Sequence, residues 1–296
     1  MLPDVIQTFD HVVVAVRDLV TSSERTAALL GREASWRGVH PGAGTANTLY
    51  RLDNGTLELL ARDGEGPIGD AVSAFLDTRG EGMLALAFGS DDVAADVAAL
   101  RERGWSPPDP RLGEGRGVAR ADGVPGVRRW TNALLPTDVT RGLQLMLIKY
   151  HSPADALPLA APGGSPDAAL GAFDHAVVIS QDLEASASIY GGALGLRLAL
   201  DRSFEARELR ILFFRVGGVT VEVAGPLAGG DAAAPDRFGG LAYRVGDIDA
   251  ARLRIHEAGI EVTEVRAGHK PGTRVSTVRG GICGVPTLLI QPAPAG

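Results

Sequence analysis

Two histidine–glutamate pairs occur at the same spacing in the two halves of the sequence. His11 precedes Glu58 by 47 positions, and His175 precedes Glu222 by 47 positions. Each glutamate interrupts an apolar run, where a carboxylate is costly unless it is paired, exposed or bound to a metal. Imidazole and carboxylate together are common ligands of Fe(II), Mn(II), Zn(II) and Ni(II). The four residues are therefore candidate metal ligands; the alternative is a strand-capping histidine and a glutamate that points to water.

Each pair lies in a repeated arrangement of predicted strands around one helix. The triplet Phe-Asp-His at residues 9–11 recurs at residues 173–175, and it opens a β-branched run both times. Asp18 and Asp182 follow at the same offset, and Asp is a good helix N-cap because its carboxylate accepts hydrogen bonds from free backbone N–H groups. Strands joined by a turn end each unit. The histidine thus opens the first strand, and the glutamate lies in the last.

Two weaker copies of the unit complete the chain, one from Leu84 and the other from Leu241. The pattern predicts four βαβββ modules, paired into an α+β fold of two domains. The first domain spans residues 1–151 and the second spans 172–296. A linker at 152–171, rich in Pro, Ala and Gly, joins them and is expected to bury little surface.

Composition and charge narrow the class of protein. The 296 residues are 45% hydrophobic and carry a formal net charge of -7. No run of Lys or Arg indicates a nucleic-acid surface, and no stretch reaches the roughly 18 apolar residues of a membrane span. Cys283 is the single cysteine, which excludes an internal disulfide and favours a reducing compartment. With no signal-peptide pattern, we expect a cytoplasmic protein whose partner is a small molecule, with a homodimer left open.

The modules resemble those of the vicinal oxygen chelate superfamily, with His on the first strand and Glu on the last. That superfamily includes glyoxalase I, extradiol ring-cleaving dioxygenases, fosfomycin-resistance enzymes and metal-free bleomycin-binding proteins. The first half is similar to glyoxalase-like domains with a His-Pro-Gly-x-Gly-Thr-x-Asn segment, here at residues 40–47. The resemblance covers nearly the whole chain apart from the linker. It implies that each pair of modules forms a U-shaped half-barrel cup with metal ligands from its first and last strands.

Half of the ligand positions that the resemblance implies hold other residues. Counting back from the helix-capping aspartates of the weaker modules gives Ala85 and Gly240 in place of histidine. Met146 and Leu288 stand where glutamate is needed, and Gln144 lies two residues from Met146 on the same strand face. The extradiol arrangement needs a second histidine and a final glutamate, which argues against ring cleavage.

Two loop histidines are candidates for ligand or substrate contact. His40 opens the Gly-rich segment of the first module, and His269 lies in a similar loop of the last module. Either would complete a two-histidine, one-carboxylate set in its domain; the alternative is a substrate contact or an exposed turn residue. The run Arg128-Arg129-Trp130 suits either an anionic substrate or a solvated strand. The remaining candidates for substrate binding are Asn47, Trp130 and Gln144.

Two functions from different classes follow. The first is a divalent-metal-dependent lyase, isomerase or dioxygenase acting on a small oxygen-rich or aromatic substrate, whose neighbouring oxygens chelate the metal. The second is a metal-free protein that sequesters a small molecule, as the bleomycin-binding relatives do. The doubled pair favours the enzyme, and the missing ligands at Ala85 and Gly240 favour sequestration. The first half is the better candidate for the active one because it combines His11, Glu58 and the His40 loop.

Overall fold

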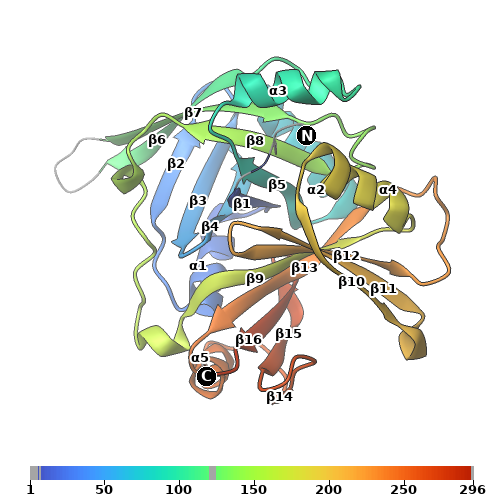
Figure 1. Cartoon of the computed structure of the whole chain (residues 1–296). Coiled ribbons are helices and arrows are strands. Elements are labelled where there is room, and N and C mark those ends of the chain that lie inside the picture. The colour runs from blue at the N-terminus through green and yellow to red at the C-terminus, as the bar shows by residue number, and fades with distance from the viewer. Residues whose placement is uncertain (1–5, 7, 120–124, 295–296) are drawn as a thin grey trace.

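Two eight-stranded β-sheets organise the chain, one in each half (Figure 1). The computed structural model describes residues 6, 8–119 and 125–294. The first sheet is a closed barrel with the strand order β1-β4-β3-β2-β6-β7-β8-β5. The elements of this domain are β1 (Thr8–Ala15), α1 (Leu19–Leu30), β2 (Trp36–His40), β3 (Thr45–Leu52), β4 (Gly55–Arg62), α2 (Pro67–Arg79), β5 (Gly82–Gly89), α3 (Val93–Glu102), β6 (Arg111–Ala119), β7 (Pro125–Leu134) and β8 (Gln144–Tyr150).

The second sheet is open, with the order β10-β11-β12-β9-β13-β16-β15-β14 and edges at β10 and β14. Figure 1 shows it in yellow to red below the blue and green barrel. Its elements are β9 (Leu170–Ile179), α4 (Leu183–Ala187), a π-helical turn (Ser188–Ala193), β10 (Arg197–Phe204), β11 (Leu209–Val216), β12 (Val219–Pro226), β13 (Arg237–Val245), α5 (Ile248–Glu257), β14 (Arg266–Ala267), β15 (Arg274–Ile282) and β16 (Val285–Gln291).

Four βαβββ modules follow one another along the chain, as the sequence predicts. The helix of the first begins as expected: the Asp18 carboxylate accepts hydrogen bonds from the backbone N–H groups of Val20 and Thr21. Gly31 ends that helix in the left-handed conformation, with φ of 65°. Among the described residues, no helix is long and apolar enough to cross a membrane.

A short strand pairing converts the implied half-barrel of the first domain into a closed barrel. β2 and β6 pair through Gly38 with Gly117 and Val39 with Arg116. A Cβ at Gly38 would lie 2.5 Å from the backbone oxygen of Arg116, so a larger residue would push the strands apart. The second sheet has no such closure between its described edge strands, and it keeps the open form that the resemblance implies.

The helix α2 fills one end of the barrel and was not anticipated from the module pattern. Val72 and Leu76 of α2 pack against Val13, Leu60 and Ala85, which face the interior. Pro at the first turn starts the helix without losing a hydrogen bond. The barrel is therefore closed at this end, and a ligand has to enter at the other.

The segment between the two sheets is mostly exposed, as expected, but it packs on the first domain at a few apolar positions. Leu157 is buried against Trp36 and Leu49. Arg51 donates a hydrogen bond to the backbone oxygen of Ala154 at 2.9 Å, which fixes the course of the segment. Leu157 and Ala160 bury their side chains on the first domain instead of in a core of the segment's own. Composition alone does not reveal this packing.

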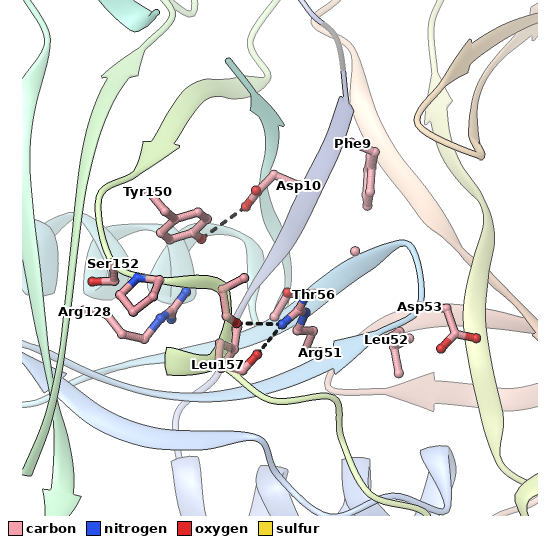
Figure 2. A pocket seen from close by; sticks show the side chains of 13 residues that line it. Phe9, Asp10, Arg51, Leu52, Asp53, Thr56, Arg128, Tyr150, Ser152 and Leu157 are labelled. Carbon is pink, nitrogen blue, oxygen red and sulfur yellow. Dashed lines mark hydrogen bonds between the residues drawn. The ribbon is translucent and has the colours of Figure 1, made fainter. Parts of the chain in front are cut away.

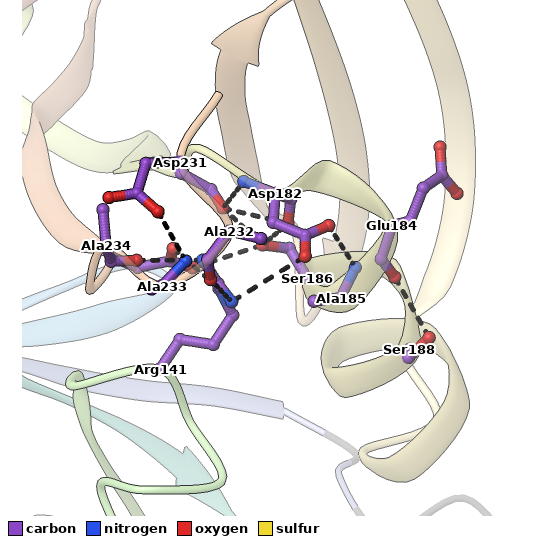
Figure 3. Close-up of polar contacts among 12 residues, drawn as sticks. Arg141, Asp182, Glu184, Ala185, Ser186, Ser188, Asp231, Ala232, Ala233 and Ala234 are labelled. Atoms are coloured by element: carbon purple, nitrogen blue, oxygen red, sulfur yellow. Dashed lines mark hydrogen bonds and ion pairs between the residues drawn. The ribbon is translucent and has the colours of Figure 1, made fainter. Parts of the chain in front are cut away.

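A buried ion pair ties the two domains together away from the barrel. Figure 3 shows the contacts of Arg141 with the loop that contains Ala232 and Ala234. Arg141 donates from Nε to Oδ1 of Asp236 at 3.0 Å, and the Asp236 side chain is 1% exposed. The Nη groups of Arg141 donate to the backbone oxygens of Ala232 and Ala234. The hydroxyl of Ser186 donates a further hydrogen bond to Asp236 at 3.2 Å. The guanidinium thus fastens a loop of the first domain to a loop of the second.

Candidate functional site

A β-bulge places two neighbouring side chains, Asp10 and His11, inside the barrel. In the β1–β5 ladder Phe9 pairs with Phe88 and His11 pairs with Ala87, so Asp10 is one extra residue on β1. Ordinary alternation along a strand would send Asp10 and His11 to opposite faces, and the bulge removes that alternation. His11 Nδ1 donates to Asp10 Oδ1 at 2.6 Å. The same bulge occurs at Asp174 in the second domain.

Glu58 lies on the other side of His11. β1 and β4 are parallel, with His11 opposite Thr56, so Glu58 is the next interior residue along β4. His11 Nε2 lies 3.5 Å from Glu58 Oε2, and the two side chains are 6% and 12% exposed. The predicted approach of His11 and Glu58 within one cup is confirmed. The His11 imidazole therefore lies between two carboxylates, with Nδ1 facing Asp10 and Nε2 facing Glu58.

The Gly-rich segment at 40–47 extends this polar chain. Asn47 Nδ2 donates to Glu58 Oε1 at 2.7 Å and to His40 Nε2 at 3.2 Å. His40 Nδ1 in turn lies 2.8 Å from the Thr45 hydroxyl. The Asn47 carbonyl oxygen Oδ1 is buried without a hydrogen-bond partner. A buried acceptor without a donor is costly, so this oxygen is positioned to accept a hydrogen bond from a bound molecule.

The two histidines of the barrel have opposite pKa shifts. Burial alone lowers the pKa of His11, but the hydrogen bond and charge of Asp10, with the charge of Glu58, raise it above its ordinary value. Burial lowers the pKa of His40, and the charge of Glu58 only partly opposes this. His11 therefore favours the imidazolium form, whereas His40 favours the neutral form that accepts the Asn47 N–H.

We expect the two histidines to titrate on opposite sides of the ordinary midpoint of 6.5. Because folding raises the pKa of His11, its protonation stabilises the fold below that pH, and this contribution is lost as the pH rises through the folded pKa. Histidine Cε1–H NMR titration, assigned with His11→Gln and His40→Gln, measures both midpoints. A His11 midpoint below that of His40 would contradict the geometry described above.

A cavity of about 330 Å³ opens at the mouth of the barrel (Figure 2). Its wall comes from the start of β1, the β3–β4 hairpin, β7, the end of β8 and the segment after β8. Tyr150 in this wall donates to Asp10 Oδ1 at 3.2 Å. Burial, together with the charges of Asp10 and Glu58, raises the pKa of Tyr150 well above its ordinary value. The polar chain of the barrel therefore continues to the cavity wall through Asp10 and Tyr150.

The opposite wall of the barrel combines an indole ring with glycines. Trp130 makes an edge contact with His40, with ring centroids 5.7 Å apart. A Cβ at Gly113 would lie 2.3 Å from the Trp130 ring, whereas a Cβ at Gly115 would come no closer than 3.4 Å. Glycine on β6 thus makes room for the indole, which lines the barrel.

Gly113→Ala should therefore lower the free energy of unfolding by about 1–3 kcal/mol, because the added methyl group overpacks the Trp130 ring. Gly115→Ala, on the same strand and face, is the matched control and should have a clearly smaller effect. Urea unfolding followed by tryptophan fluorescence measures both. Equal losses in the two variants would show that glycine is needed on β6 for reasons other than the indole.

The other half of the barrel repeats this arrangement without its charged groups. The β1–β5 register makes Ala85 the counterpart of His11, and the β5–β8 register makes Met146 the counterpart of Glu58. Asn132 donates its amide to the Met146 sulfur at 3.3 Å, as Asn47 does to Glu58. The side-chain amide of Gln144 donates to the backbone oxygens of Leu135 and Leu145.

The second domain keeps a similar but less complete pair. His175 Nδ1 lies 2.9 Å from Asp174 Oδ1 and 3.5 Å from Glu222 Oε1, so one nitrogen faces both carboxylates. Burial would raise the pKa of Asp174, but hydrogen bonds from His175 and Arg244 lower it to about 2. Ile211, which pairs with Ala224, takes the place that Asn47, paired with Leu60, has in the barrel.

The remaining positions of the second domain do not gather around this pair. The ladders make Gly240 and Leu288 the counterparts of His175 and Glu222. His269 lies in an exposed turn, where its Nε2 is 3.1 Å from an Nη of Arg207.

Comparison with models of known families shows which superfamily the chain belongs to. Residues 9–170, more than half of the sequence, match the model of the glyoxalase-like domain. Residues 174–277 match the model of the glyoxalase, bleomycin resistance protein and dioxygenase superfamily. The chain belongs to the vicinal oxygen chelate superfamily. No curated protein matches its sequence.

Solved structures share the whole two-domain arrangement of this vicinal oxygen chelate protein. A variant of 4-hydroxymandelate synthase from Streptomyces coelicolor is 18% identical, with a TM-score of 0.67 over 98% of this chain and 94% of that one. A hypothetical protein from Staphylococcus aureus is 11% identical, with a TM-score of 0.63 over 96% and 99%. A fusion of a xylose isomerase-like TIM barrel with a 4-hydroxyphenylpyruvate dioxygenase has a TM-score of 0.62 at 15% identity, over 100% of this chain and 50% of the fusion. At these identities the likeness concerns the fold.

A resident metal held by three or more protein ligands does not fit the donor sets. The described residues hold no group of three or more His, Cys, Asp or Glu side chains that could bind an ion. The predicted set of His11, His40 and Glu58 is wrong, because the Asn47 amide lies between His40 and Glu58. The predicted set that adds His269 to the second pair is wrong too, because His269 is in an exposed turn with Arg207. Each domain is left with one His–Glu pair.

Proposed function

We propose that the barrel of the first domain is the active site of an enzyme that moves a proton on a small organic molecule, with Glu58 as the base. The observation that supports this most is the polar chain Asp10–His11–Glu58–Asn47, which runs through a closed barrel next to a cavity. The second domain holds an apolar residue where Asn47 would be, and its sheet is open. We assign it a supporting role.

The cavity brings a bound molecule close to Glu58. Thr56 lines the cavity and precedes Glu58 by two residues on the same strand face. Interior neighbours on one strand are about 7 Å apart. A molecule that touches Thr56 therefore reaches the Glu58 carboxylate if it extends one interior residue further into the barrel. The orphan acceptor of Asn47 lies next to Glu58, because the two side chains are joined by a hydrogen bond.

Each residue of the polar chain Asp10–His11–Glu58–Asn47 has a role in proton transfer. The Asn47 amide fixes one oxygen of Glu58 and leaves the other facing His11. Glu58 accepts the proton from an acidic C–H bond of the substrate. His11, held by Asp10, carries positive charge beside the site and stabilises the negative charge that develops on the substrate.

Deuterium incorporation tests this proposal without knowledge of the substrate. The full chain, incubated in D2O with a mixture of small metabolites, should add solvent deuterium to a defined subset of them, which mass spectrometry detects. A metabolite that binds without exchange or conversion would support sequestration instead. Absence of both binding and exchange would overturn the proposal.

A divalent ion bound by His11 and Glu58 is the second candidate. Two ligand atoms on adjacent positions of one ion, with bonds of about 2.1 Å, lie about 3.0–3.4 Å apart, close to the 3.5 Å between His11 Nε2 and Glu58 Oε2. Such an ion would polarise a substrate oxygen, with substrate atoms completing its coordination. Exchange that survives dialysis against EDTA favours the metal-free site; exchange restored only by Fe(II), Mn(II), Zn(II) or Ni(II) favours the ion.

A further inference from the structure

Arg128 differs sharply from its neighbour in sequence. The two arginines alternate on β7, so Arg128 points into the barrel and Arg129 points out. Arg129 is paired with Glu114, and its side chain is 63% exposed. Arg128 is 7% exposed and lines the cavity at the barrel mouth. β7 therefore buries the Arg128 guanidinium close to the site and leaves that of Arg129 in solvent.

Aromatic rings hold the Arg128 guanidinium from its sides. The guanidinium carbon lies 4.9 Å from the centroid of the Tyr150 ring and 5.6 Å from that of Trp36. Within the described part of the chain, no carboxylate forms an ion pair with Arg128. Stacking orients the guanidinium but does not replace a hydrogen-bonding anion, and a buried charge without one is costly.

Two other charged residues of the cavity, Asp10 and Arg51, already have partners. Asp10 is held by His11 and Tyr150, and Arg51 donates to the backbone oxygens of Ala154 and Leu157. Figure 2 shows Arg128 and Tyr150 on one side of the cavity and Asp53 on the other. Arg128 thus offers its N–H groups to the cavity next to a neutralised carboxylate.

We propose that Arg128 binds the carboxylate of a small organic acid in this cavity. This inference rests on the proposed function and names its substrate class. A guanidinium matches a carboxylate with two parallel hydrogen bonds, and the neighbouring rings fix its plane. The cavity of about 330 Å³ holds a molecule of roughly ten to fifteen non-hydrogen atoms, so the carboxylate rests on Arg128 and the remainder extends past Thr56 toward Glu58.

The test compares acids with their neutral amides on the full chain. Benzoate, phenylacetate and butyrate are each titrated beside the matching primary amide, and binding is followed by NMR chemical-shift changes. We expect at least one acid to bind about 10- to 100-fold more tightly than its amide, as a charge-assisted hydrogen-bond pair implies. Equal binding of every acid and its amide, or no binding of any acid, would overturn the inference.

Three variants locate the effect. Arg128→Leu should abolish the preference for acids, and Arg129→Leu, on the outer face, should keep it. Glu58→Gln should keep acid binding while deuterium incorporation stops, so failure of the substrate class and failure of the proposed function give different results. Acid preference that persists in Arg128→Leu would place the anion site elsewhere. The acid–amide comparison in the wild type stands even if Arg128→Leu does not fold.

Discussion

Arg141→Met should lower the free energy of unfolding by about 3–5 kcal/mol, because it leaves the carboxylate of Asp236 buried without its ion-pair partner. Three hydrogen bonds from the guanidinium, to Asp236 and to two backbone oxygens of the second domain, disappear at the same time. Among the described residues, only Ser186 then remains to donate a hydrogen bond to the carboxylate. Urea unfolding followed by circular dichroism measures the loss.

Arg274→Met is the matched control for this prediction. Arg274 forms an ion pair with Asp249 that has the same chemistry but lies on the surface, where solvent screens it. We expect its unfolding curve to overlay that of the wild type. If Arg141→Met unfolds at the same urea concentration as Arg274→Met, the Arg141–Asp236 pair does not hold the domains together.

The fold and the ligand positions could be predicted because they repeat along the chain. The Phe-Asp-His triplets and the equal His–Glu spacings fix the register of each module, and the observed ladders place Ala85, Gly240, Met146 and Leu288 where that register put them. Local signals such as the Asp18 cap are strong because they need few residues.

The places of Asp10 and Arg128 in the site could not be predicted, because they depend on strand irregularities and on neighbours distant in sequence. Alternation would place Asp10 and His11 on opposite faces, and only the bulge brings them together. The recurrence of Asp beside His in both triplets was the available signal. For Arg128, its spacing of two residues from Trp130 indicated a shared face, but not that this face is the barrel interior.

The loop histidines show the limit of residue type as evidence. His40 precedes a Pro-Gly segment and His269 a Lys-Pro-Gly segment, and both were candidates to complete a ligand set, with His40 the stronger. His40 is drawn into the barrel because β2 and β3 form a hairpin that pairs it with Thr45. His269 lies in the turn between the short edge strand β14 and its partner β15, and it stays exposed.

Glu58→Gln should reduce deuterium incorporation by about 100- to 10,000-fold, the usual contribution of a general base. The amide keeps the shape of the carboxylate but cannot accept the proton. Glu222→Gln makes the same change in the second domain, where the pair lacks the Asn47 contact. It should leave incorporation close to the wild-type rate.

The ratio of these two rates tests the central claim most directly. Deuterium incorporation into the same metabolite pool is measured for the wild type, Glu58→Gln and Glu222→Gln at equal protein concentration, with circular dichroism to confirm folding. We predict incorporation by the wild type and Glu222→Gln and almost none by Glu58→Gln. Undiminished incorporation by Glu58→Gln, or a loss confined to Glu222→Gln, would contradict the assignment of the active site to the first-domain barrel.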